Sequence, residues 1–110
     1  MRALPFAHGA FWVASGLWPI VHLPSFERVT GPKVDGWLVK TMGGMIAAVG
    51  ATLIGSSFGK ASRTEQILGA ASAGVLAASS LWYGGRGRIS RVYLVDAAVE
   101  GAIAGTWLSR

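Results

Sequence analysis

The absence of charged residues from long stretches of the chain constrains its fold more than any other feature. Asp, Glu, Lys and Arg are all missing from three windows, residues 3–26, 41–59 and 66–85. A fourth window, residues 92–109, contains only two of them, Asp96 and Glu100. A helix needs about 20 mostly apolar residues to cross a bilayer, and each window has roughly this length. The sequence therefore predicts four membrane spans.

These spans are expected to be helices arranged as one antiparallel bundle. Every backbone amide inside the hydrocarbon core must find its hydrogen bond within the protein, and the polar-apolar alternation of membrane strands is absent. The predicted spans are residues 6–23, 37–57, 66–84 and 89–108. The first is expected to be retained, because no A-x-A cleavage site follows it. Short links predict an all-α four-helix transmembrane bundle in up-down-up-down order, a single domain over residues 1–110.

Composition supports a membrane rather than a soluble protein. Only 14% of the residues are charged and 52% are hydrophobic, whereas soluble domains carry about 25% charged residues. The net charge is +5, but the basic residues stand in short stretches between apolar runs. That distribution is typical of membrane flanks and not of a nucleic-acid-binding face. The lipid bilayer is therefore the expected partner, and no nucleic acid is expected.

The links between the spans carry the turn signals and most of the charge. They cover residues 24–36, 60–65 and 84–88. In the first link, Ser25 is expected to start a short interfacial turn, and the Asp35 side chain is expected to cap the second span. Six basic residues flank the first and third links, against four on the side of the termini. This bias favours a cytoplasmic location for the first and third links.

Small residues recur every four positions in the last three spans, which places each set on one helix face. The sets are Gly43, Ala47, Ala51 and Gly55 in the second span, Gly69, Ala73 and Ala77 in the third, and Gly101 and Gly105 in the fourth. Lipid provides no hydrophobic drive for helix pairing, so such faces predict close packing. The packing would lie within one chain or form a homo-oligomer. Ser79 and Ser80 are expected to form hydrogen bonds across helices.

Asp96 and Glu100 are the candidate functional residues. They are four residues apart and share a face of the last span with Tyr93. A charge near the bilayer centre costs about 2.5–3.5 kcal/mol, and two adjacent carboxylates repel each other, so they must find cations or hold a shared proton. This pattern predicts a protonatable cation-binding site. In the structural alternative, a carboxylate simply pairs with Lys40 or Arg28.

Other chemistry is not indicated by the sequence. Lys40 is expected to extend toward the interface, or to act as the counter-ion of Asp96. His8 and His22 lie about 21 Å apart along a helix, too far to share one metal ion, and are expected at the interfaces. There is no cysteine and no nucleophile or phosphate-loop motif. We therefore expect no metal, no cofactor and no enzymatic activity.

Two runs carry a resemblance to a known group. SFERVTGPKVDGWLVKTMG, residues 25–43, and RGRISRVYLVDAAVEG, residues 86–101, resemble small bacterial four-helix membrane proteins of unassigned function, loosely DoxX-like. The resemblance implies a multi-pass protein of the bacterial inner membrane. It brings no catalytic or ligand motif, so no functional residue is carried over.

Two functions remain as hypotheses from the sequence. The first is a small transporter or channel that uses Asp96 and Glu100 as a protonatable cation site. The alternative is a non-catalytic accessory or scaffold subunit whose small-residue faces bind a membrane-protein partner. A charge-removing substitution at Glu100 and a bulky one at Gly101 would separate the two.

Overall fold

The computed structural model describes residues 1–32, 35–85 and 92–109, and within these ranges the chain is all-helical, with five helices and no strands. The helices are α1 (Ala3–Val21), α2 (Leu23–Thr30), α3 (Gly36–Ser56), α4 (Arg63–Gly85) and α5 (Val92–Leu108). The all-α class is thus confirmed. Residues 86–88 of the third predicted link lie outside the described residues, as do five of the ten basic residues used in the charge comparison.

Three helices are long and apolar enough to cross a membrane. They are α1, α3 and α4, with mean hydropathies of 1.2, 1.5 and 1.3. Helix α5 is 17 residues long, or about 26 Å, slightly less than the roughly 30 Å of a hydrocarbon core. The fourth span, and with it the four-helix bundle, stays a prediction.

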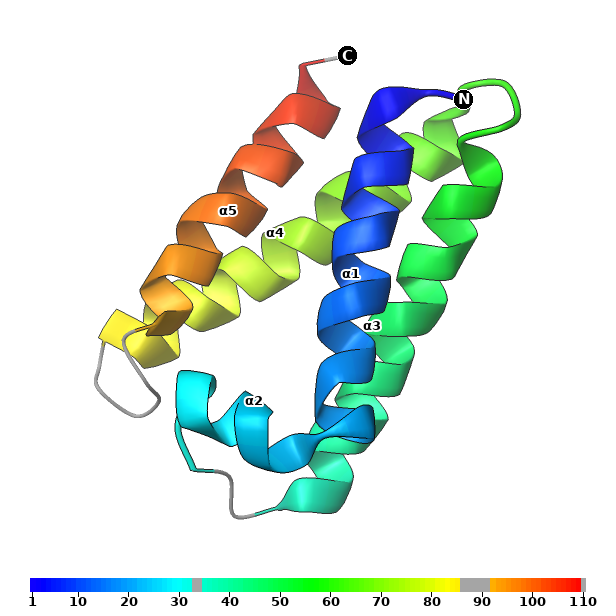
Figure 1. The fold of residues 1–110 in the computed structure, drawn as a ribbon. Coiled ribbons are helices and arrows are strands. Elements are labelled where there is room, and N and C mark those ends of the chain that lie inside the picture. The colour runs from blue at the N-terminus through cyan, green and yellow to red at the C-terminus, as the bar shows by residue number, and fades with distance from the viewer. Residues whose placement is uncertain (33–34, 86–91, 110) are drawn as a thin grey trace. The chain divides into compact units, whose positions relative to one another are not determined.

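The chain divides into two compact units, Met1–Ala61 and Ser62–Arg110. The first unit contains α1, α2 and α3, and the second contains α4 and α5. Each unit has one antiparallel helix pair, visible in Figure 1 as α1 beside α3 and α4 beside α5. The single domain predicted over residues 1–110 stays a prediction.

In the first unit, α1 and α3 approach each other through pairs of glycines. Gly9 faces Gly50 and Gly16 faces Gly43, so the two helices run antiparallel. A methyl group added to Gly50 would lie only 2.6 Å from the carbonyl oxygen of Gly9. Glycine is required here because the backbone of one helix occupies the place of a side chain on the other.

The close contacts of α3 include part of the small-residue set predicted for it. Gly43 and Ala47 of that set both contact Gly16, and Gly50, seven residues after Gly43, contacts Gly9. Ala51 and Gly55 are exposed within the described chain, and their role in packing stays a prediction. A seven-residue period keeps one side of each helix toward its partner when two helices cross at a small angle, whereas a four-residue period drifts around the helix.

Helix α2 is a further difference from the prediction. The first span was predicted to run to residue 23, with only a short turn after it, but α1 ends at Val21 and an eight-residue helix follows. Pro24 has no amide hydrogen to continue the α1 ladder, and it fits the first turn of a new helix. The chain therefore bends at His22 and begins α2 immediately.

Side-chain contacts fix α2 against the end of α1. The Nδ1 atom of His22 accepts a hydrogen bond from the Ser25 amide (3.2 Å), so His22 is the N-cap of α2. Trp18 donates its indole N–H to Ser25 Oγ (2.8 Å). The rings of Trp18 and Phe26 pack edge to face, with their centroids 5.3 Å apart. These contacts hold α2 across the C-terminal end of α1 (Figure 1).

The two histidines of the first unit lie in different surroundings. His22 is exposed at the corner, as expected for an interfacial residue. His8 is instead 1% exposed, and its ring packs edge to face against Trp12, with the ring centroids 4.5 Å apart. His8 is therefore buried inside the first unit, and its predicted location at a membrane interface stays a prediction.

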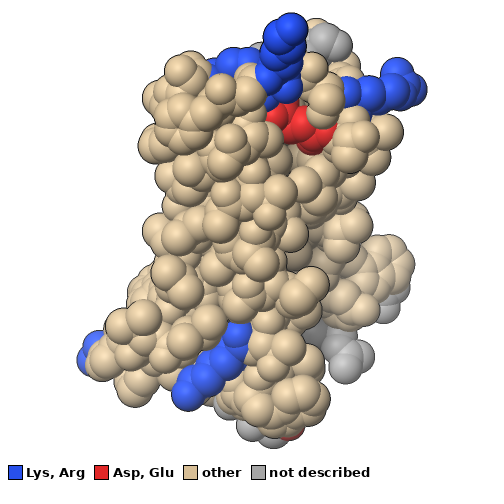
Figure 2. All heavy atoms as spheres, turned by 90° about the vertical axis from the view of Figure 1, so that its right-hand side faces the viewer, with Lys and Arg blue, Asp and Glu red and all other residues tan. Residues whose placement is uncertain are grey.

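Charged side chains of the first unit lie at its ends. Arg2 donates to the carbonyl oxygens of Ser56 (2.7 Å) and Gly59 (3.0 Å), where α3 ends. Lys40 and Arg28 are exposed near the opposite end of α3. Figure 2 draws the whole chain and shows Lys and Arg near the top and the bottom of one face, with a band of uncharged residues between them. In the first unit, basic residues at the ends of long apolar helices are typical of membrane-crossing segments.

The side-chain cap predicted for Asp35 is wrong. Asp35 stands at the N-cap position of α3, but its carboxylate makes no capping hydrogen bond. Its backbone carbonyl instead accepts from Leu38 (3.1 Å) and Val39 (3.2 Å). The Asp35 side chain is exposed.

Candidate functional site

Helix α5 places the two predicted carboxylates on one side of the second unit. Asp96 and Glu100 are one turn apart, about 6 Å along the helix axis. Asp96 is half-buried, and Glu100 is 1% exposed. Because four-residue spacing keeps both side chains on one face, a proton or cation held by one is close to the other.

Asp96 is held by a hydroxyl group of the neighbouring helix. Ser80 of α4 donates a hydrogen bond from Oγ to Asp96 Oδ2 (3.2 Å). The prediction that Ser80 bonds across helices is thus confirmed, whereas Ser79 is exposed. Among the described residues of the second unit Asp96 forms no ion pair, and Arg63, the basic residue described there, lies about 26 Å along α4 from Ser80.

Glu100 occupies the midpoint of α5, which runs from Val92 to Leu108. It is one of the least exposed large side chains of the chain. A carboxylate at this depth of an apolar helix carries a large desolvation cost when ionised. That cost is offset where the carboxylate binds a proton or a cation, or where a polar contact holds it in place.

Two further residues, Tyr93 and Lys40, were predicted to belong to the site. Tyr93 lies in the first turn of α5, one turn before Asp96, and is half-buried. Lys40 belongs to α3 of the first unit, and its side chain is exposed. Its suggested role as a counter-ion stays a prediction.

Helices α4 and α5 are joined by contacts that the sequence did not predict. The Trp107 indole lies directly on Gly69, where a methyl group would overlap the ring. Gln66 donates from Nε2 to the carbonyl oxygen of Trp107 (2.7 Å). The predicted face of α4 contributes Gly69 and Ala73, both of which are buried. The glycine in that face was the available signal, but nothing in the sequence identified Trp107 as its partner.

The predicted packing residues of α5 are not used in the described structure. Gly101 and Gly105 are exposed, and a methyl group on either would have no atom within 4 Å. Together with Gly55 on α3, they leave open helix surface. Their role in association stays a prediction.

No cluster of metal ligands accompanies the carboxylates. Within residues 1–32, 35–85 and 92–109, no three His, Cys, Asp or Glu side chains gather as a metal ion would require. Comparison with known proteins gives no further guidance, because the chain matches no protein-family model, no curated protein and no solved structure.

Proposed function

We propose that this chain is a four-span integral membrane protein that moves protons or a small cation by means of Asp96 and Glu100. The spans would be α1, α3, α4 and α5. The observation that carries the proposal is the position of Glu100, which is buried at the midpoint of α5 one turn from a second carboxylate. Location in a bacterial inner membrane is proposed from the resemblance of residues 25–43 and 86–101.

The surroundings of Asp96 support a site that exchanges protons. Ser80 offers a neutral donor to the carboxylate, and the second unit offers no cation to it among the described residues. A carboxylate neutralised permanently by Arg or Lys would be a structural ion pair. Asp96 instead has a neutral donor and lies one turn from a second carboxylate, and this makes its charge responsive to pH or to a bound cation.

Proton flux in reconstituted vesicles tests the proposal. The purified chain is placed in liposomes with internal K⁺ and a trapped pH-sensitive dye, and valinomycin sets the membrane potential. We expect a proton flux above that of empty vesicles, and we expect Glu100→Gln to abolish it, because the amide keeps the shape but cannot ionise. Asp35→Asn is the matched control, since this carboxylate is exposed outside the helices. Equal flux in wild type and Glu100→Gln would contradict the proposal.

A specific observation also favours the accessory or scaffold function. Gly101 and Gly105 present a small-residue face of α5 that no described residue covers. A subunit of this kind would carry no flux of its own. Gly101→Leu would then reduce its association in cross-linking experiments, whereas Gly74→Leu, at another glycine with open space, would not.

A further inference from the structure

Helix α2 has an outer side that the proposed function does not use. Its inner side is marked by Phe26, which packs on Trp18, and by Thr30, which is buried. Arg28 is two residues from each of them, so it lies on the opposite side of the helix, and its side chain is exposed. Val29 beside it is 51% exposed. The outer side of α2 therefore combines a cation with an apolar side chain.

The first turns of α3 extend this surface. A methyl group added to Gly36 would lie 3.4 Å from Leu23 Cδ2, so the start of α2 lies beside the start of α3. Trp37 is 70% exposed. Lys40 follows three residues later on the same side of α3, and it is exposed as well. We define the corner surface as Arg28, Val29, Trp37 and Lys40.

The two cations of the corner surface favour an anionic partner. Neither Arg28 nor Lys40 forms a hydrogen bond or ion pair with the described residues of the chain. Of the two acidic residues nearby, Glu27 is only half exposed, and Asp35 is exposed just before α3. A guanidinium group binds phosphate oxygens through paired hydrogen bonds, and an ammonium group binds them as a point charge. Phosphate is therefore the chemical group that the two cations fit.

The position of α2 indicates where that phosphate would come from. Helices α1 and α3 are long and apolar enough to cross a membrane, and α2 lies across the C-terminal end of α1 (Figure 1). A short helix in this position would follow the membrane surface. Trp37 and Val29 would then meet the boundary between headgroups and acyl chains, and the long basic side chains would reach the headgroups. A free phosphate ion would leave both apolar side chains in water.

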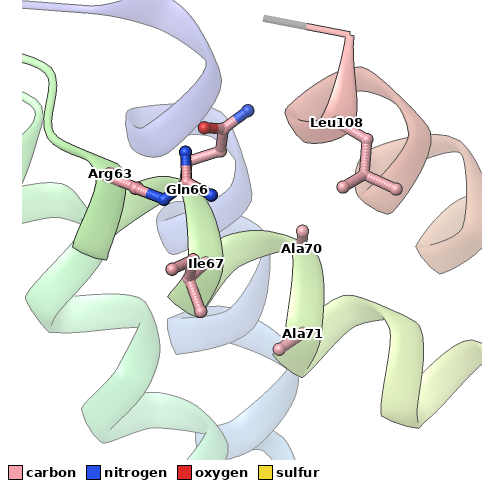
Figure 3. A pocket seen from close by; sticks show the side chains of 6 residues that line it. All are labelled: Arg63, Gln66, Ile67, Ala70, Ala71 and Leu108. Atoms are coloured by element: carbon pink, nitrogen blue, oxygen red, sulfur yellow. The ribbon is translucent and has the colours of Figure 1, made fainter.

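The start of α4 offers a cation without the rest of this arrangement. Arg63 is the first residue of α4 and is exposed. The side chains around it in Figure 3 include no aromatic ring; they are Gln66, Ile67, Ala70, Ala71 and Leu108. Arg63 is therefore a matched control for the cations of the corner surface.

We propose that the corner surface binds the headgroups of acidic phospholipids, with Arg28 and Lys40 on phosphate groups and with Val29 and Trp37 at the edge of the acyl region. The proposal rests on the membrane location proposed above and not on the movement of protons or cations. Bound headgroups would hold α2 along the membrane surface and so fix the depth of the first unit in the bilayer.

Amide hydrogen exchange of the full chain in lipid nanodiscs tests the proposal, because a peptide covering residues 23–31 reports on α2 alone. One set of nanodiscs contains phosphatidylcholine, and the other also contains phosphatidylglycerol. We expect slower exchange of this peptide in the acidic nanodiscs. A basic residue near an acidic surface contributes about fivefold to binding, so Arg28→Gln and Lys40→Gln should each remove about fivefold of the slowing.

Two comparisons separate lipid contact from folding. Arg28→Gln and Lys40→Gln should leave exchange in phosphatidylcholine nearly unchanged, whereas a loss of folding would accelerate it in both lipids. Arg63→Gln should not affect residues 23–31 in either lipid. A nitroxide attached to Val29→Cys should collide with oxygen more often than with an aqueous nickel chelate, and one on Lys60→Cys, in an exposed link, should show the reverse.

The opposite results overturn the proposal. Equal exchange in the two kinds of nanodisc, or equal effects of Arg28→Gln and Arg63→Gln, would remove the contact with acidic headgroups. Slowing by inorganic phosphate as strong as that by phosphatidylglycerol would reduce the surface to an anion contact. Equal access of the chelate to Val29→Cys and Lys60→Cys would place α2 in water, where a soluble protein could cover it instead. Glu100→Gln should keep the lipid effect, so this test and the flux test fail independently.

Discussion

At the scale of single residues, glycines decide how closely α1 and α3 approach. The contacts are reciprocal, since Gly16 and Gly43 each turn the position of a missing side chain toward the carbonyl oxygen of the other. Gly9 and Gly50 repeat this arrangement two turns away. The Cα hydrogens therefore face carbonyl oxygens, a weak hydrogen bond that recurs where helices meet closely. In lipid, where apolar burial gives no drive to association, such contacts carry much of the pairing.

A methyl group at Gly16 is therefore expected to destabilise the first unit. In Gly16→Ala the new Cβ would overlap the Gly43 carbonyl oxygen and would lie 2.8 Å from the Ala47 amide nitrogen, so the helices must move apart. We expect a loss of about 1–3 kcal/mol in the free energy of unfolding, the usual cost of overpacking. Unfolding by SDS titration, followed by circular dichroism in mild detergent micelles, measures it.

Gly55→Ala is the control for this substitution. A methyl group at Gly55 meets no atom within 4 Å, so the only expected effect is a gain in helix propensity of up to about 1 kcal/mol. A similar loss of unfolding free energy in both variants would contradict the prediction, because it would show that Gly16 does not stabilise the first unit through the close approach of α1 and α3.

At the scale of helices, the sequence predicted the long elements well and the short one poorly. The predicted spans 37–57 and 66–84 coincide with most of α3 and α4. A charged side chain is unfavourable in hydrocarbon on any face of a helix, so the uncharged stretches mark these helices in the sequence. Helix α2 carries both Glu27 and Arg28 and has no such signal. Its position depends on contacts with Trp18, which no local pattern reveals.

The choice of partners between helices was equally hidden. The spacing of Asp96 and Glu100 predicted their shared face, and Ser80 was a predicted cross-helix donor that the structure confirms. Pairing of Gly69 with Trp107 required knowledge of where two helices meet. The fit of a large side chain on a glycine depends on the surfaces of both helices, whereas a sequence pattern describes the surface of only one helix.

The N-cap at His22 gives a prediction for α2 as an element. His22→Ala removes the side-chain acceptor of the Ser25 amide, and loss of an N-cap costs about 0.5–2 kcal/mol of helix stability. We expect faster amide hydrogen exchange in residues 23–31, measured by mass spectrometry of that peptide. His22→Asn, which keeps an acceptor at the N-cap, should exchange nearly as slowly as wild type. If the alanine and asparagine variants exchange alike, the cap does not hold α2.

At the scale of the whole molecule, the number of crossings determines where the end of the chain lies. Three crossings by α1, α3 and α4 would leave the start of α5 on the opposite side from Lys60. Whether α5 crosses as well decides the location of Ser109. The same crossing decides whether Glu100 lies at the middle of the bilayer, and so whether the proposed cation site is in the membrane at all.

Single cysteines can locate these positions, because the chain has no cysteine of its own. Pro32→Cys, Lys60→Cys and Ser109→Cys each replace an exposed residue outside the helices. A membrane-impermeant maleimide is added to intact cells and to opened cells that express each variant. With four crossings we expect Lys60→Cys and Ser109→Cys to react from the same side and Pro32→Cys from the other. The basic residues around the first link favour a cytoplasmic location for Pro32, so Pro32→Cys should react only in opened cells. If Ser109→Cys instead behaves like Pro32→Cys, α5 does not cross, and Glu100 cannot serve a transmembrane path.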